Sequence, residues 1–198
     1  MSRRDEILAV AKVQIAQRGY ANTSMRDIGE AAGVLAGSLY SHFKGKAELV
    51  GDIVVRFYEE LIPAQRAIVD GDGTGAEKLR EMIAAVYAVC AGHQAELTIL
   101  HYDWQTLSGL DELADVHAQS LETLDLWQAV IEQGKADGSL LPTVDTTAMV
   151  RIATSSIHAL IDSVRYHDHP LVDGGGVDLG AQLQTVLLGG VATDRPTS

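Results

Sequence analysis

Apolar residues recur along most of this chain at intervals of three and four positions, the spacing that places them on one face of an α-helix. In the first such segment the apolar stripe runs from Ile7 to Ile15, and Gly19 is expected to end the helix after Arg18. Similar patterns, separated by glycine and proline residues, predict later helices at about 75–91, 94–107, 112–136, 145–166 and 178–192. No segment shows the alternation typical of a strand. The pattern therefore predicts an all-α protein with roughly nine helices.

Two further short patterns follow the first helix. The second helix opens at Thr23 or Ser24, has Asp27 in the position of a capping-box acid, and ends at Gly33. A third pattern covers Ala36–Phe43. Two short helices joined by a glycine-containing turn form the helix-turn-helix pattern, whose second helix enters the major groove of DNA.

A long helix is predicted to follow, from near Lys46 to Asp70, and Pro63 is expected to kink or shift it. Lys46 lies at its start, where the helix dipole and the free N–H groups favour a phosphate. Gly37 would let DNA approach the backbone closely. Donors for phosphates or base edges are offered by Ser38, Tyr40, Ser41 and His42. On spacing alone, an ordinary three-helix bundle with solvated polar faces is equally compatible with the pattern.

The charge of the chain first argues against nucleic acid and then, by its distribution, for it. Fifteen Lys and Arg residues against 27 Asp and Glu residues give the 198-residue chain a net charge of -12. Residues 1–50 carry seven basic and five acidic side chains, or +2, which leaves -14 for the other 148 residues. Such asymmetry indicates a nucleic-acid-binding part joined to a part with another task.

The residues TSMRDIGEAAGV (23–34) and GSLYSHFKGKAEL (37–49) resemble the TetR family of bacterial transcriptional repressors, over about a quarter of the chain. The resemblance implies a three-helix DNA-binding domain at 1–46 and a six-helix ligand-binding and dimerisation domain at 47–198. Positions that contact operator DNA in the family are matched by Thr23, Ser38, Tyr40, His42 and Lys46. The full predicted DNA-binding set adds Arg26, Ala36, Gly37 and Ser41. Leu35 departs from the family pattern, because a serine cap commonly precedes the recognition helix.

Three segments resemble a narrower group, the actinobacterial repressors of steroid catabolism that sense acyl-CoA thioesters. These segments are 33–40, 163–166 and 186–191. The resemblance implies an acyl-CoA effector, with a generic lipophilic or xenobiotic ligand as the alternative. The predicted function is thus a homodimeric repressor that binds a palindromic operator and is released by a small molecule.

An effector pocket between helices is expected to be mostly apolar with a few polar groups. Candidate lining residues are Tyr87, Cys90, His101, Tyr102, Trp104, Trp127 and Arg165. The aromatic residues could equally be plain core residues. Arg165 could hold a ligand carboxylate or CoA phosphate, or pair with Asp162 or Asp168.

The last two predicted helices carry much apolar surface. By family resemblance they form a four-helix dimer interface, and by composition alone they could equally close the core of one chain. The candidate interface residues are Ile157, Leu160, Ile161, Val164, Leu179, Leu183, Val186 and Leu187.

Other motifs are better explained without special chemistry. Asp70–Gly75 with Glu81 nearly fits a calcium loop, but Thr74 and Glu77 are better placed to cap the next helix. His167-Asp168-His169 lies in a loop rich in Pro and Gly, without further ligands. We therefore expect neither metal nor cofactor.

No nucleophile–base motif appears, so an all-α enzyme is the weaker alternative, alongside a helical partner-binding protein. A single cysteine, Cys90, cannot form an internal disulfide, and its apolar neighbours favour a buried, unreactive thiol. The chain shows no apolar stretch of membrane-spanning length and no signal-peptide pattern, so a cytoplasmic location is expected.

Overall fold

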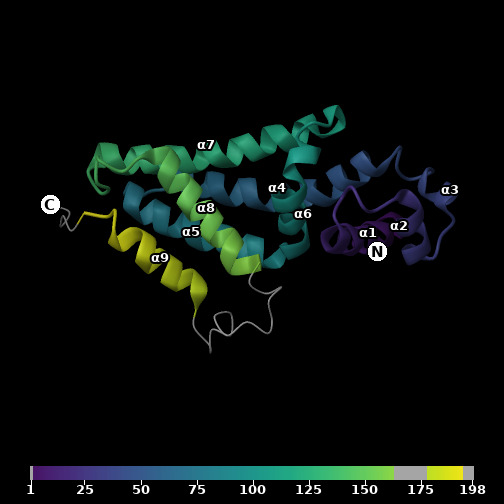
Figure 1. Cartoon of the computed structure of the whole chain (residues 1–198). Helices are drawn as coiled ribbons and strands as arrows, with labels where there is room; N and C mark the ends of the chain where they lie inside the picture. The colour runs from purple at the N-terminus through teal and green to yellow at the C-terminus, as the bar shows by residue number, and fades with distance from the viewer. Residues whose placement is uncertain (1, 163–177, 194–198) are drawn as a thin grey trace. The chain divides into compact units, whose positions relative to one another are not determined.

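A computed structural model describes residues 2–162 and 178–193, apart from the side chains of residues 36 and 160–162. The described chain is helical and contains one isolated β-bridge, so the all-α prediction is confirmed (Figure 1). The helices are α1 (Arg3–Arg18), α2 (Met25–Ala32), α3 (Ala36–Leu39), α4 (Lys46–Asp70), α5 (Gly75–Gly92), α6 (Gln94–Leu107), the 3-10 helix η1 (Asp111–Leu113), α7 (Ala114–Asp137), α8 (Thr146–Asp162) and α9 (Leu179–Gly189).

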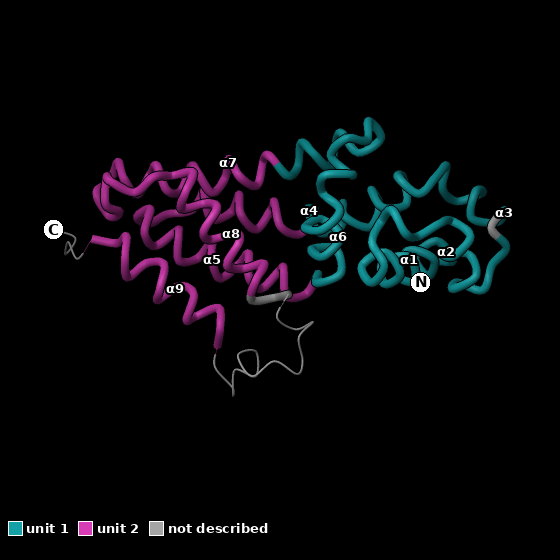
Figure 2. The backbone as a smooth tube through the Cα atoms, viewed as in Figure 1, with its two compact units in different colours: residues 1–59, 93–120 teal, residues 60–92, 121–198 magenta. Residues whose placement is uncertain are grey.

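The chain divides into two compact units, coloured separately in Figure 2. Unit 1 contains residues 1–59 and 93–120, and unit 2 contains residues 60–92 and 121–198. Helices α4 and α7 each contribute residues to both units. The helix-turn-helix segment, formed by α2 and α3, therefore belongs to the same compact unit as the start of α4 and the whole of α6.

The first helix ends, and the second begins and ends, where the sequence predicts. Ser2 and Asp5 form a complete capping box at α1, and Ser24 and Asp27 form another at α2. Gly33 ends α2 in the left-handed conformation, with φ of 67°, which a residue with a Cβ adopts only at a cost. These local signals account for the agreement.

The third predicted helix is shorter than the Ala36–Phe43 segment, because α3 ends at Leu39. Leu35 precedes it without a side-chain cap, and Gly37 lies within it as a poor helix former. The Ser41 hydroxyl donates to the Ser38 carbonyl at 2.7 Å, a local contact that competes with regular helix geometry. Residues 40–42 consequently form a turn.

The core of unit 1 joins α1 to α2 and α6, and α2 to α3. The predicted apolar stripe from Ile7 to Ile15 is buried, as are Leu39 and Phe43. A 2.7 Å ion pair between Lys12 of α1 and the buried Glu96 of α6 adds a polar contact to this core. The buried side chains of Leu39 and Phe43 therefore anchor residues 35–43, which we call the recognition segment, in the core of unit 1.

Unit 2 packs α5 against α8 and α9, with Trp127 of α7 fully buried. The Thr74 backbone N–H donates to Glu77 at 2.8 Å and the Thr74 hydroxyl does so at 2.9 Å, which confirms the helix-capping interpretation of this loop. Pro63 lies inside α4 without ending it. No single helix in the described ranges is long and apolar enough to cross a membrane; α5 and α6 satisfy that length and composition test only when combined across the break at His93.

Candidate nucleic-acid interface

The segment from α2 to the turn after α3 exposes most of the predicted DNA-binding side chains. Gly37, Ser38 and Ser41 are exposed, and Tyr40 keeps 58% of its surface accessible. His42 is half-buried beside the Phe43 ring, and the side chain of Ala36 lies outside the described residues. The exposed hydroxyl groups can donate to or accept from phosphates and base edges.

Arg26 of α2 is also exposed and pairs with Glu30 one turn later, at 2.9 Å. The hydrogen bond to Glu30 raises the pKa of Arg26. An ion pair this exposed contributes little to stability, so a DNA phosphate can replace Glu30 at small cost.

Thr23 and Lys46, by contrast, are engaged inside unit 1. Thr23 is buried, and its hydroxyl donates to the Gly19 carbonyl at 2.9 Å. The Lys46 ammonium donates to the carbonyls of Thr23, at 2.8 Å, and of Tyr20, and it lies 4.0 Å from the centre of the Tyr20 ring. Desolvation lowers the pKa of Lys46. Both side chains therefore fix the loop between α1 and α2, and their predicted contacts with DNA stay predictions.

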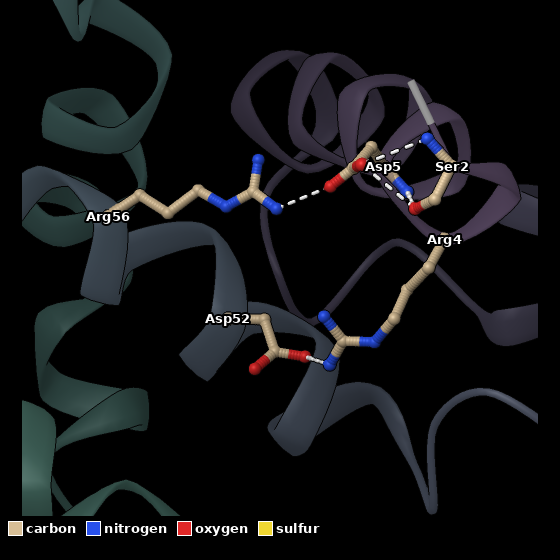
Figure 3. Close-up of polar contacts among 5 residues, drawn as sticks. All are labelled: Ser2, Arg4, Asp5, Asp52 and Arg56. Atoms are coloured by element: carbon tan, nitrogen blue, oxygen red, sulfur yellow. Dashed lines mark hydrogen bonds and ion pairs between the residues drawn. The ribbon is translucent and has the colours of Figure 1, made fainter.

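Two ion pairs join α1, the helix before the helix-turn-helix segment, to the first half of α4 (Figure 3). Arg56 contacts Asp5 at 2.5 Å, and Arg4 contacts Asp52. The hydrogen bond from Arg56 holds the pKa of the Asp5 carboxyl well below its usual range. The Arg4 guanidinium also lies 4.8 Å from the centre of the Phe43 ring, at the end of the recognition segment. α4 is thus joined by two ion pairs to α1, whose Arg4 also contacts Phe43 after α3.

Sequence reasoning missed these ion pairs, since no short-range spacing connects residues some fifty positions apart. It also treated Leu35 only as a lost cap. Leu35 is 83% exposed, the largest value among the large apolar residues that the structure describes as exposed. Its signal in the sequence is a large apolar residue in the turn between two DNA-binding helices.

The predicted effector-pocket residues are divided between the two units. Tyr87, Cys90 and Trp127 belong to unit 2, where Cys90 and Trp127 are buried. In unit 1, His101 and Tyr102 are exposed. Trp104 is stacked on the His117 ring, with the two ring centres 5.5 Å apart. Arg165 lies outside the described residues.

Within unit 2, Tyr87 and Cys90 have internal roles. A Cβ on Gly180 would come within 2.9 Å of the Tyr87 ring, so this ring already packs against α9. Burial raises the pKa of the Cys90 thiol to about 12, which disfavours the thiolate.

A buried polar residue of unit 2 also escaped sequence reasoning. Gln65 of α4 is fully buried, and neither its amide nitrogen nor its amide oxygen has a hydrogen-bond partner in the described structure. It lies in the same stripe as the buried Leu61 and Ile62. A polar residue at a core position of an apolar helix is the sequence signal that marks it.

The predicted dimer residues show different degrees of burial. Ile157 and Leu183 are buried within unit 2, Leu179 and Leu187 are half-buried, and Val186 is 72% exposed. The side chains of Leu160 and Ile161 and the whole of Val164 lie outside the described residues. Ile152, another apolar residue of α8, is 53% exposed.

An exposed helix-turn-helix segment, supported by long helices and followed by a second all-α unit, defines the class of helical DNA-binding transcription regulators. Comparison with known proteins agrees with this class. Residues 7–53 match the model of bacterial regulatory proteins of the tetR family, and residues 72–162 match that of the tetracyclin repressor-like C-terminal domain. The HTH-type transcriptional repressor KstR2 of Mycolicibacterium smegmatis is 31% identical over 98% of this chain and 93% of its own. The chain belongs to the TetR family.

Solved structures support the same assignment. The ketosteroid transcriptional regulator KstR2 of Mycobacterium tuberculosis superimposes with a TM-score of 0.83 at 30% identity, over 98% of this chain and 96% of the other. AibR, solved with isovaleryl coenzyme A and operator DNA, shares the fold with a TM-score of 0.75 at 22% identity, over 95% and 97% of the two chains. Between the alternatives that the sequence pattern left open, the chain is a transcriptional repressor and not an enzyme.

Proposed function

We propose that this chain is a homodimeric repressor that binds a palindromic operator and is released by an acyl-CoA thioester. The observation that carries the proposal is the recognition segment, residues 35–43, with its exposed polar side chains, in a chain similar over nearly its whole length to KstR2 repressors. The two DNA-binding domains of the dimer, one from each chain and called heads below, would contact two half-sites related by the symmetry of the dimer.

The proposed dimer forms through α8 and α9. Val186 and Ile152 support it, because they expose large apolar side chains on these two helices. Ile157 and Leu183 are already buried within unit 2, so in this proposal they support the interface from beneath. A single exposed apolar residue needs no explanation, whereas one on each of two contacting helices favours an interface.

The proposed effector binds in unit 2. Gln65 supports this placement, because a buried amide with both atoms unpaired costs about 1–3 kcal/mol, which a ligand with a carbonyl or hydroxyl group would offset. A groove of about 590 Å³ in unit 1 is a poor alternative for an anionic CoA thioester. Four carboxylates line that groove: Glu48, Asp52, Glu112 and Asp115. Their charge would repel the CoA phosphates.

Release of DNA would follow from a shift in population between two head arrangements, which requires different effector affinities in the two states. Within unit 1, the pairs of Asp52 with Arg4 and of Arg56 with Asp5 would transmit a displacement of α4 to α1. Continuity of α4 from Lys46 to Asp70 supports this route.

The test combines thermal shift with operator binding. A series of CoA thioesters, from isovaleryl to steroid-derived acyl chains, is compared with uncharged lipophiles of equal size. We expect one class of CoA thioester to raise the unfolding temperature and to release a selected operator fragment, since a bound ligand stabilises the native state. A response to uncharged lipophiles alone would overturn the acyl-CoA assignment, and absence of sequence-selective DNA binding would overturn the repressor function.

Gln65→Leu tests the placement in unit 2. The variant should retain operator binding, because Gln65 lies outside unit 1, and should lose about tenfold in effector affinity with the loss of a hydrogen bond. The matched control is Gln119→Leu in unit 1, whose buried amide oxygen is likewise unpaired in the described structure. Equal losses in both variants would contradict a site at Gln65.

A further inference from the structure

The start of the recognition segment has an unusual chemical character. Leu35 is the residue before the first turn of α3, with extended backbone angles and no side-chain cap. Its side chain is 83% exposed, whereas Leu39, one turn later, is fully buried. Leu35 therefore contributes nothing to the core of unit 1, and its apolar surface lies in the segment that meets DNA.

The two residues after Leu35 add no hydrogen-bonding side chain, because they are Ala36 and Gly37. Gly37 has no positive φ, and a Cβ built on it meets no atom within 4 Å. The fold of this chain therefore does not require a glycine there. A glycine inside a helix costs about 1 kcal/mol relative to alanine, so its use at an open position points to something outside the chain that comes close.

The N-terminal residues of a recognition helix are those that contact base edges in helix-turn-helix proteins. Side chains without donors or acceptors cannot pair with the polar edges of guanine, adenine or cytosine in the major groove. Thymine alone presents a methyl group there, and apolar side chains contact it. The lack of polar groups at 35–37 thus selects one kind of base contact.

We propose that Leu35 reads a thymine in each operator half-site through the C5 methyl group, and that Gly37 permits the close approach that this contact needs. The polar side chains farther along the segment, Ser38, Tyr40 and Ser41, then fix the register on phosphates and neighbouring bases. This inference rests on the proposed binding to a palindromic operator, and it does not depend on the effector or its site.

The experiment replaces thymidine by deoxyuridine. This removes the C5 methyl group of the base and keeps the base pair and its polar edge. An operator is first selected from random-sequence duplexes with the full-length chain, and each thymine of a half-site is then replaced in turn. We expect one position at which the substitution weakens binding about fourfold per half-site, the value of one buried methyl group. Leu35→Ala should bind more weakly and lose the sensitivity at that position.

Val13→Ala is the matched control, because Val13 is an exposed apolar residue of α1 that is also in unit 1. It should keep both affinity and sensitivity to deoxyuridine. Gly37→Ala gives an independent readout, with an unchanged or higher unfolding temperature and weaker operator binding. The proposal is overturned if no thymine position responds in the wild type, or if Leu35→Ala responds as strongly as the wild type.

Discussion

Replacing Lys46 by methionine separates two roles for the same side chain. In the structure its ammonium group donates to the Tyr20 and Thr23 carbonyls and contacts the Tyr20 ring. The sequence had suggested instead a contact with a DNA phosphate. Methionine keeps most of the apolar stem and removes the charge and the donors, so Lys46→Met removes the polar contacts with little change in packing.

The expected loss follows from those contacts. A hydrogen bond from a charged group contributes about 1.5–3 kcal/mol when buried, and the half-exposed position of Lys46 reduces that value. Two such bonds should together contribute about 2 kcal/mol to the stability of the native state. For a chain of this size, that loss lowers the unfolding temperature by about 4–8 °C.

The assay pairs thermal unfolding with the salt dependence of operator binding. If Lys46 acts inside unit 1, Lys46→Met unfolds at lower temperature and keeps the wild-type salt slope when measured well below that temperature. Lys44→Met is the control, since the exposed Lys44 side chain makes no polar contact in the described structure and its loss should leave stability unchanged. An unchanged unfolding temperature, with a salt slope shallower by about one per head, would instead establish the phosphate contact.

Three further predictions concern packing, pH and reactivity. Gly75→Ala should destabilise the native state by about 1–3 kcal/mol in denaturant unfolding, because its Cβ would lie 2.1 Å from the Gly134 nitrogen. Gly92→Ala, with open space around it, should leave stability unchanged. Hydrogen bonding lowers the pKa of Asp5 below the ordinary value of 3.8. The stability that Asp5 contributes is therefore complete above about pH 4 and is lost as the pH falls. The difference in unfolding free energy between wild type and Asp5→Asn should shrink below that pH. Cys90, with its pKa raised to about 12, should resist iodoacetamide at pH 8 in the native chain and react once the chain is unfolded.

The end of α1 and the bounds of α2 and α4 could be predicted because local signals determine them. Ser2, Ser24 and Gly33 act through their own backbone neighbourhood, so the sequence contains the whole cause. The predicted helix at Ala36–Phe43 was too long, because no cap residue marks its end and the prediction relied on spacing alone. Leu39 and Phe43 lie four positions apart and are both buried, but this spacing is equally compatible with a short helix followed by a turn.

The candidate site was harder to predict, because exposure depends on contacts that are distant in sequence. Thr23 and Lys46 have the residue types expected of DNA contacts. However, the Thr23 hydroxyl donates to Gly19 within the loop between α1 and α2, and the Lys46 ammonium donates to the carbonyl of Thr23 in the same loop. Leu35 has a residue type expected of the core and is exposed. Residue type and helical position therefore identified the DNA-binding segment but not which of its side chains face outward.

The excess of two positive charges in residues 1–50 overstates the charge available to DNA. Arg4 and Lys12 pair with carboxylates of unit 1, and Lys46 donates to backbone carbonyls. Two other arginines pair with glutamates one turn away. In the described part of this segment, the side chains of Arg18 and Lys44 have no ion pair, and Arg26 can exchange its exposed Glu30 partner for a DNA phosphate. Free cations supply the sequence-independent affinity for DNA, and few are available here. We therefore expect this repressor to depend mainly on contacts made in register, including the proposed contact of Leu35 at the start of the recognition segment.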